Sequence, residues 1–261
     1  MDKQINIKEL LDWYIWAGVD TTCSDDACLS VNTEPKPDTN IINSTQQSVS
    51  QNFANKQPIS NILKNAKDVC ASAQSLDELK DLLCHFDGCS LKNTAASTVF
   101  GDGCPTAKVM LIGEAPGADE DATGTPFVGR AGKYLTQLMQ ETGFDRKKDF
   151  YICNTVKCRP PENREPAIEE REACSKYLEA QINIVRPKLV VLCGSVAAKE
   201  FLGKDIKITQ VRGKRFNIAG KIPATVILHP SYLLRNHSEE PNSPRWLTKQ
   251  DLKDIKKFIE N

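Results

Sequence analysis

Four short apolar runs in the second half of the chain predict buried strands. They cover residues 107–113, 149–158, 188–194 and 221–230. Runs of this length without polar alternation are typical of strands that are covered on both faces, as in a parallel sheet. Two of them, 107–113 and 188–194, end in glycine, a common way to leave a strand. We therefore predict a central parallel sheet of four strands.

Helical periodicity fills the gaps between these runs. Apolar residues recur at three- and four-residue spacing over 131–142, 167–184, 195–203 and 248–259. An earlier helix is predicted over 76–86, with Ser75 as its N-cap and Glu78 in the capping-box position. Strands that alternate with helices indicate the α/β class, in which helices cover both faces of a parallel sheet.

The first 75 residues differ from the rest and are predicted to be an N-terminal extension. A short helix over 5–18 is followed by a stretch, 20–60, that is rich in Asn, Ser, Thr, Gln and Pro. Such a composition buries too little apolar surface to offset chain entropy, so we expect a flexible linker. The short helix is a candidate for docking on the core or on a partner protein. Residues 76–261 form the second predicted domain.

The net charge of the 261-residue chain is zero, but the charge is unevenly placed. Residues 1–88 carry 7 Lys, no Arg and 13 acidic residues, a balance of −6, so the remainder carries +6. A basic domain suits an anionic partner such as nucleic acid, although ordinary solvated surface explains the same balance. No apolar run is long enough to span a membrane, and the N-terminus lacks a secretory signal. We expect a cytoplasmic monomer.

Ten cysteines and only three histidines are present. In a reducing compartment we expect free or metal-bound thiols rather than disulfides, and the small number of histidines argues against a His-rich zinc enzyme.

Polar clusters follow three of the predicted strands. The first strand leads into GEAPGADED (113–121), the second ends at Asn154 before KCRPPENR (157–164), and the last leads into HPSYLLRN (229–236). In parallel sheets ligands bind beyond the carboxyl ends of the strands, so these clusters should converge. Each alone also has a structural explanation, as a tight turn, a capping amide or a surface loop. The phosphate-loop pattern GxxxxGK[ST] is absent.

Seven segments in register resemble the family 4 uracil-DNA glycosylases, the iron–sulfur type. They are VFGDG (99–103), GEAPGADED (113–121), GTPFVGRAG (124–132), NTVKCRPPENR (154–164), LCGSVAAKEFLG (192–203), TQVRGK (209–214) and HPSYLLRN (229–236). The resemblance covers roughly residues 84–259. It implies a three-layer α/β/α sandwich around a parallel four-stranded sheet. It also implies base excision repair: hydrolysis of the bond between uracil and deoxyribose in DNA, which leaves an abasic site.

The resemblance assigns roles to the residues at the strand ends. Phe127 matches the aromatic residue that stacks on the flipped uracil, and Asn154 matches the amide that pairs with the uracil edge. His229 matches the histidine that donates to uracil O2, and the backbone around Ala115 is expected to help hold the base. Ala115 stands where the best-known uracil glycosylases have an aspartate that positions water. The nearby carboxylates are Glu114 and Glu120, of which we favour Glu120 as a pocket wall or water ligand.

The segment after His229 matches the loop that enters the duplex. Leu233 or Leu234 is expected to wedge the base stack, and Arg235 to contact phosphate. The alternative is a loop that packs its own leucines on the core. Further candidates for contact with the DNA backbone are basic residues elsewhere in the domain: Arg130, Arg159, Arg164, Lys214 and Arg215.

Four cysteines are candidates to bind a [4Fe–4S] cluster. Cys89, Cys158 and Cys174 match the family pattern, but Phe86 stands where the family has its first cysteine, and Cys84 gives C-x4-C instead. Four thiolates suit iron–sulfur or zinc, and the resemblance favours iron–sulfur. The alternative is a degenerate site with three free thiols.

Three rival functions stay open. One is a non-catalytic uracil- or DNA-binding member of the same fold that acts in a replication or repair assembly. A covalently trapping relative is disfavoured, because no histidine-bearing insertion separates GADED from PFVGR. An unrelated nucleotide hydrolase lacks its phosphate loop and its carboxylate metal cluster.

Overall fold

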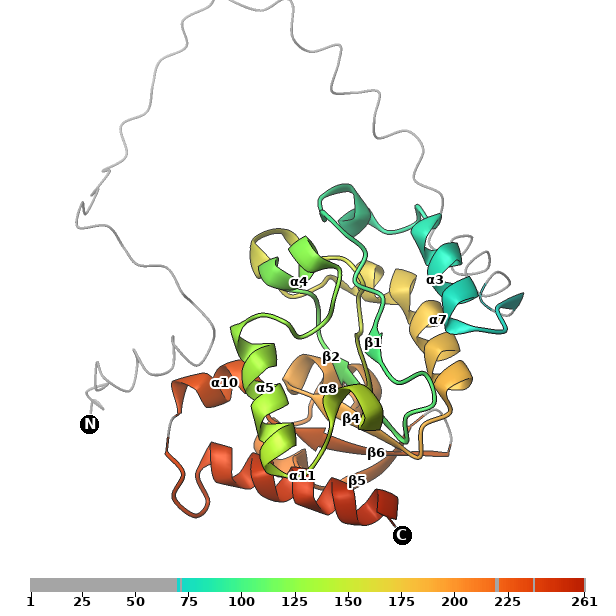
Figure 1. The fold of residues 1–261 in the computed structure, drawn as a ribbon. Coiled ribbons are helices and arrows are strands. Elements are labelled where there is room, and N and C mark those ends of the chain that lie inside the picture. Colours follow the sequence, from blue (N-terminus) through green and yellow to red (C-terminus); the bar gives the residue numbers. More distant parts are fainter. Residues whose placement is uncertain (1–69, 71, 219–220, 237, 261) are drawn as a thin grey trace, which may run out of the picture. The chain divides into compact units, whose positions relative to one another are not determined.

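The computed structural model describes residues 70, 72–218, 221–236 and 238–260. The helix predicted over 5–18 and the linker predicted over 20–60 lie outside these residues. The described part is a mixed α/β fold (Figure 1). None of its helices is long and apolar enough to cross a membrane.

A six-stranded sheet forms the centre, in the order β1-β3-β2-β4-β6-β5. Its strands are β1 (Asp102–Gly103), β2 (Val109–Gly113), β3 (Phe150–Asn154), β4 (Leu189–Cys193), β5 (Arg215–Ile218) and β6 (Ile222–Ile227). Neighbours among β3, β2, β4 and β6 pair in parallel, whereas β1 and β5 are antiparallel edge strands. The prediction of a four-stranded sheet is therefore wrong in the number of strands. The two edge strands are short, and one of them is half-exposed and polar, so neither has an apolar run.

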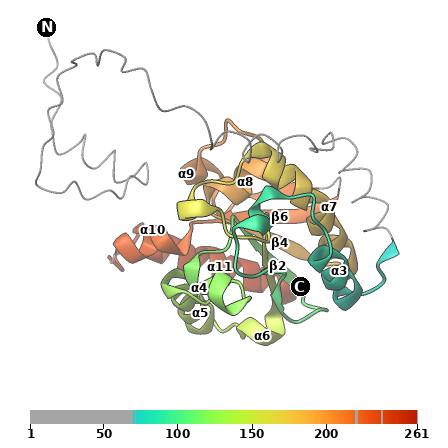
Figure 2. The same ribbon diagram turned by 90° about the horizontal axis from the view of Figure 1, so that it is seen from above.

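Helices cover both faces of the sheet (Figures 1 and 2). The larger ones are α3 (Leu76–Cys84), α5 (Arg130–Glu141), α7 (Ile168–Val185), α8 (Ser195–Leu202) and α11 (Pro244–Glu260). The shorter ones are α4 (Ala118–Thr123), α6 (Arg146–Asp149), α9 (Ile208–Val211) and α10 (Pro230–Arg235), with two 3-10 turns at Ser90–Asn93 and Pro161–Asn163. The helices predicted within the described residues all appear, with ends shifted by a few residues.

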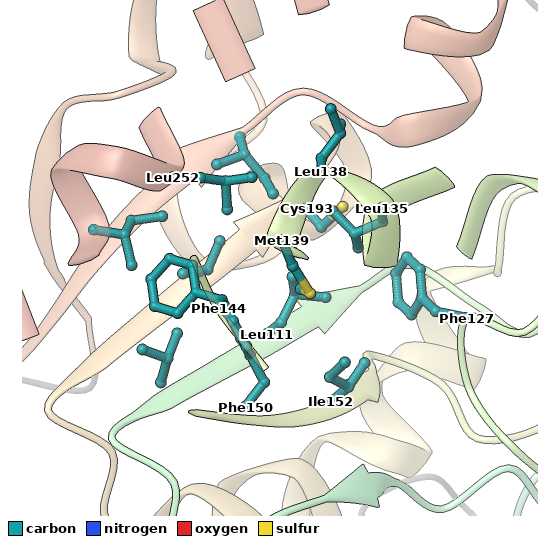
Figure 3. Close-up of a cluster of buried hydrophobic side chains, with 14 of the residues drawn as sticks. Leu111, Phe127, Leu135, Leu138, Met139, Phe144, Phe150, Ile152, Cys193 and Leu252 are labelled. Atoms are coloured by element: carbon teal, nitrogen blue, oxygen red, sulfur yellow. The ribbon is translucent and has the colours of Figure 1, made fainter. Parts of the chain in front are cut away.

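Two apolar clusters lie on opposite faces of the sheet because side chains alternate along each strand. Val109 and Leu111 of β2 pack with α5 and α11, while Met110 and Ile112 pack with α7 and α8. Figure 3 shows the first cluster, with Phe127 at one edge of it. Strands β2, β3 and β4 are buried over their whole length, as continuous apolar runs predict, whereas the first two residues of β6 are half-exposed.

Local sequence sets the ends of the helices. Ser75 accepts a hydrogen bond from the Glu78 amide and so caps α3, as predicted. The Glu78 carboxylate accepts from the Gln74 amide, one residue before the usual capping-box partner. At the C-terminal end of α7, the helix stops at Arg186, which adopts a left-handed conformation immediately before Pro187.

Candidate functional site

Two predicted side chains, Asn154 and His229, lie at the carboxyl ends of parallel strands. Gly113 and Asn154 are register partners at the ends of β2 and β3. His229 follows β6 by two residues and packs against Gly194, which follows β4. Parallel pairing thus places residues that are far apart in the sequence at one edge of the sheet, as the strand pattern predicts.

Gly113 is the point at which the side chains meet. A Cβ atom here would lie within 2.8 Å of the Phe127 ring and would also clash with Asn154 Oδ1. The ring centroids of Phe127 and His229 are 6.3 Å apart. An aromatic ring and an amide therefore lie against a residue that has no side chain of its own, and the imidazole of His229 lies beside the same aromatic ring.

Asn154 carries an unpaired polar atom. Its side chain is 2% exposed, yet Oδ1 has no hydrogen-bond partner among the described residues. Burial of an amide oxygen without a partner is unfavourable, and native proteins mostly avoid it. The cost is recovered when a ligand brings a donor, so this oxygen is suited to bind an N–H group.

Ser231 fixes which nitrogen of His229 carries the hydrogen. The Ser231 amide donates to His229 Nδ1 over 3.3 Å, and Ser231 Oγ lies 2.7 Å from the same nitrogen. Because an accepting nitrogen carries no hydrogen, the neutral ring has its hydrogen on Nε2. Burial, and secondarily the positive charge of Arg235, lower the pKa of His229 to about 4. The ring is a neutral Nε2–H donor at physiological pH. Our sequence reasoning missed Ser231, although its position two residues after the histidine is a usual one for such a contact.

Glu120 is occupied by backbone amides. Oε1 accepts from the amides of Val128 and Gly129 at 2.9 and 2.8 Å, and Oε2 accepts from Gly117 at 3.1 Å. We expected this carboxylate to form a pocket wall or to bind water. In the structure both of its oxygens accept hydrogen bonds that connect α4 to the segment that carries Phe127.

Glu114 lies between β2 and Ala115 and is half-buried. Burial raises its pKa to about 7, with the nearby negative charge of Glu165 adding to the shift and Arg171 opposing it. A carboxyl group with this pKa exchanges its proton near neutral pH. Ala115 is also half-buried and packs against a buried group of cysteines.

The predicted DNA-binding residues fall into different environments. Leu233 is fully buried in the first core cluster, which favours the alternative that it packs on the core over its assignment as a wedge in the base stack. Its neighbour Leu234 is half-buried, and Arg235 is exposed at the end of α10. Arg164 makes a two-pronged ion pair with Glu170, with contacts of 2.6 and 2.8 Å, so its guanidinium is already partnered.

Three of the four predicted cluster cysteines lie together. Cys89, Cys158 and Cys174 are buried in one small cluster, and a hydrogen bond from Cys174 lowers the pKa of Cys89 to about 7. Cys84 is exposed at the end of α3 and lies outside that cluster. Among the described residues no group of three or more His, Cys, Asp or Glu side chains is placed to hold a metal ion.

A cavity of about 370 Å³ lies elsewhere, between α7 and α8. Arg171 and Glu200 form an ion pair on its lining, which Leu178 and Phe201 complete with apolar surface. None of Phe127, Asn154 and His229 lines it. We therefore place the candidate site at Gly113 rather than in this cavity.

Comparison with known proteins gives a consistent picture. The uracil DNA glycosylase superfamily model matches residues 100–254. The type-4 uracil-DNA glycosylase of Thermotoga maritima is 45% identical over 172 residues, which is 66% of this chain and 88% of that relative. The type-4 enzyme of Sulfurisphaera tokodaii is 40% identical over 192 residues, 70% of this chain and 84% of that relative. The type-4 enzyme of Pyrobaculum aerophilum is 41% identical over 167 residues, with 61% and 85% covered.

Proposed function

We propose that this chain removes uracil from DNA. It belongs to the uracil-DNA glycosylase superfamily and to its type-4 members. The reaction hydrolyses the bond between uracil and deoxyribose and leaves an abasic site for base excision repair. The observation that carries this proposal is the unpaired Asn154 Oδ1 at a point shared with Phe127 and His229.

Recognition of the base is assigned to Asn154 and Phe127, with the backbone at Ala115 helping to hold the base. The Asn154 amide can accept from uracil N3–H through Oδ1 while it donates to O4. Cytosine has the opposite pattern, with an acceptor at N3 and a donor at C4, and would leave the amide mispaired. Stacking on the Phe127 ring contributes roughly 1–3 kcal/mol without distinguishing the bases. Selection therefore comes from the amide.

Departure of the base is assigned to His229. Uracil leaves as an anion, and a hydrogen-bond donor aimed at the developing charge binds the transition state more tightly than the ground state. The neutral Nε2–H, held by Ser231 on the other side of the ring, is such a donor at the pH of the cell.

The two carboxyl groups receive different roles. Glu120 is assigned to holding the loop, because its oxygens already accept three amide hydrogen bonds. Glu114 stays a catalytic candidate, since a pKa of about 7 suits a group that takes or gives a proton near neutral pH.

Contact with DNA is assigned to the end of α10. Leu234 is the remaining candidate for the wedge that replaces the flipped base, and the exposed Arg235 is placed to contact a phosphate. Arg164 would have to leave its ion pair with Glu170 to bind DNA, so we rank it behind Arg235.

We also propose that the cysteines hold a structural [4Fe–4S] cluster. Three thiols are already gathered, which supports the proposal, while Cys84 would have to join them by movement of the last turn of α3. The four-thiolate set is thus not assembled, and no step of the reaction is derived through the cluster. Its test is iron and sulfide analysis, with visible absorption, of anaerobically purified protein. Stoichiometric iron that Cys158→Ser abolishes and Cys193→Ser does not would support the cluster, and iron-free protein would contradict it.

The activity is tested with an oligonucleotide that contains one uracil. The protein is incubated with it, alkali is added, and strand cleavage at the uracil is measured, with a thymine oligonucleotide as control. Cleavage at uracil alone supports the glycosylase. Retention of the oligonucleotide without cleavage would support the non-catalytic binder instead.

A further inference from the structure

Phe127 adopts a backbone conformation that is unfavourable for its residue type. Its φ is +53°, in the left-handed region that mainly glycine tolerates, and its side chain is buried. Such a conformation persists only when the surroundings impose it, and it is found mostly where function needs a fixed geometry. The contacts that impose it on Phe127 come from both sides of the residue.

A guanidinium group binds the backbone carbonyl groups of Pro126 and Phe127. Arg146 of α6 donates from Nη1 to Phe127 O at 3.0 Å and from Nη2 to Pro126 O at 2.6 Å. The same Nη2 lies 3.1 Å from the Asp102 carboxylate of β1, which orients the side chain. Only 11% of the Arg146 side chain is exposed, so these bonds are largely shielded from water.

A carboxylate group binds the backbone amides that follow Phe127. Glu120 Oε1 accepts from Val128 and Gly129, the two residues that follow Phe127. Gly132 of α5 lets the backbone of Phe127 approach so closely that a Cβ atom there would collide with it. The backbone around Phe127 is thus held by two side chains of opposite charge. Arg146 binds the carbonyl groups up to Phe127, and Glu120 binds the amides after it.

We propose that Arg146 and Glu120 are positioning residues that hold the Phe127 ring ready to stack on the extruded base. This inference rests on the proposed function. Neither residue needs to touch the substrate. A ring fixed in place before binding loses less freedom when the base arrives, and small errors in placement are costly to the reaction.

The test is a double-mutant cycle between Arg146→Met and Phe127→Ala, read as kcat/KM for uracil excision from single-stranded DNA. With Phe127 present, Arg146→Met should lower kcat/KM roughly tenfold, because the stacking platform is no longer held. In the Phe127→Ala background the same substitution should change kcat/KM less than about twofold, because there is no ring left to position. Equal losses in both backgrounds, or no loss in either, would overturn the inference.

Arg245→Met is the matched control for loss of an arginine. Arg245 is 16% exposed and pairs with Glu141 and Glu239, away from Phe127, so its removal should lower thermal stability and leave kcat/KM unchanged. Arg146→Lys keeps the charge but cannot reach both carbonyl groups and Asp102 together, and should be intermediate.

Two further variants protect the test against misfolding. If Arg146→Met does not fold, Asp102→Asn loosens the same guanidinium from a half-exposed position and should give a smaller loss that also disappears in the Phe127→Ala background. Glu120→Gln tests the other side in the same way. Wild-type protein that excises no uracil would contradict the proposed function, whereas active protein with additive variants would contradict only the positioning role.

Discussion

The polar groups that face the candidate pocket and those that hold its walls differ in how completely they are paired. Asn154 Oδ1 is buried without a partner, whereas the Glu120 carboxylate accepts three amide hydrogen bonds and the Arg146 guanidinium bonds two carbonyl groups and a carboxylate. The difference indicates a division of labour. Groups left unpaired are available to a ligand, and groups fully paired keep the pocket in shape.

The largest effect on activity is expected from Asn154→Ala. We expect kcat/KM for uracil excision to fall more than about 100-fold, because the Asn154 amide beside Gly113 supplies both an acceptor and a donor for the uracil edge. The matched control is Gln181→Ala. Gln181 is also a fully buried amide with an unpaired oxygen, but its nitrogen bonds Phe100 O and the Tyr151 hydroxyl away from the pocket. It should lose stability and keep its activity, and equal activity losses in the two variants would contradict the division.

The next effect is expected at His229. His229→Ala should lower kcat by about 100-fold, because the leaving anion loses its donor. His229→Gln retains a neutral donor and should recover part of the loss. Since the pKa of His229 is about 4, the ring stays neutral between pH 8 and 5, and kcat should show no dependence on its protonation in that range. The contradicting result would be a pH profile of kcat in which wild type requires a protonated group and His229→Gln does not. That result would show that His229 acts as a charged ring rather than a neutral one.

A smaller effect is expected from Leu234→Ala. Extrusion of a base from a duplex costs a few kcal/mol, and a wedge that fills the gap offsets part of it, so excision from duplex DNA should fall about tenfold. Excision from single-stranded DNA should hardly change. Leu233→Ala is the contrasting variant, because its fully buried side chain should lower the thermal stability instead. Equal losses on both DNA substrates would remove Leu234 from the wedge role.

A separate effect, on stability rather than on activity, is its dependence on pH. The pKa of His229 falls from 6.5 in the unfolded chain to about 4 in the folded protein, so the unfolded chain binds the proton more readily. The free energy of unfolding should therefore decrease as the pH drops below about 6.5, and this contribution should stop changing below about 4. Denaturant unfolding of wild type and His229→Gln at several pH values measures this contribution. A difference in unfolding free energy between the two proteins that stays constant from pH 7 to about pH 4 would contradict the assignment.

Much of the fold could be predicted from the sequence, because a strand covered on both faces requires a continuous run of apolar residues. The strands that lie under two helical layers are continuous apolar runs, and all four were placed within a few residues. The edge strands β1 and β5 were missed, because a two-residue strand and a half-exposed strand bury too little to leave a pattern.

The candidate site could be predicted where a residue would act through its own type, and not where it acts through its partners. Asn154, Phe127 and His229 were found from motif positions, and parallel pairing explains why they meet. The pairing of Glu120 with the amides, the contact of Arg146 with Phe127 and the burial of Leu233 depend on tertiary contacts. A list of residue types near a motif cannot distinguish a supporting carboxylate from a catalytic one.

The most direct test of the account is the identity of the base released from DNA. Wild-type protein is incubated with a duplex that carries one uracil, and free bases are separated and quantified beside the abasic sites formed. The account predicts free uracil in equal amount to abasic sites, and no free cytosine or thymine from matched duplexes. Release of cytosine at a comparable rate, or abasic sites formed equally well by Asn154→Ala, would contradict recognition of uracil by the Asn154 amide.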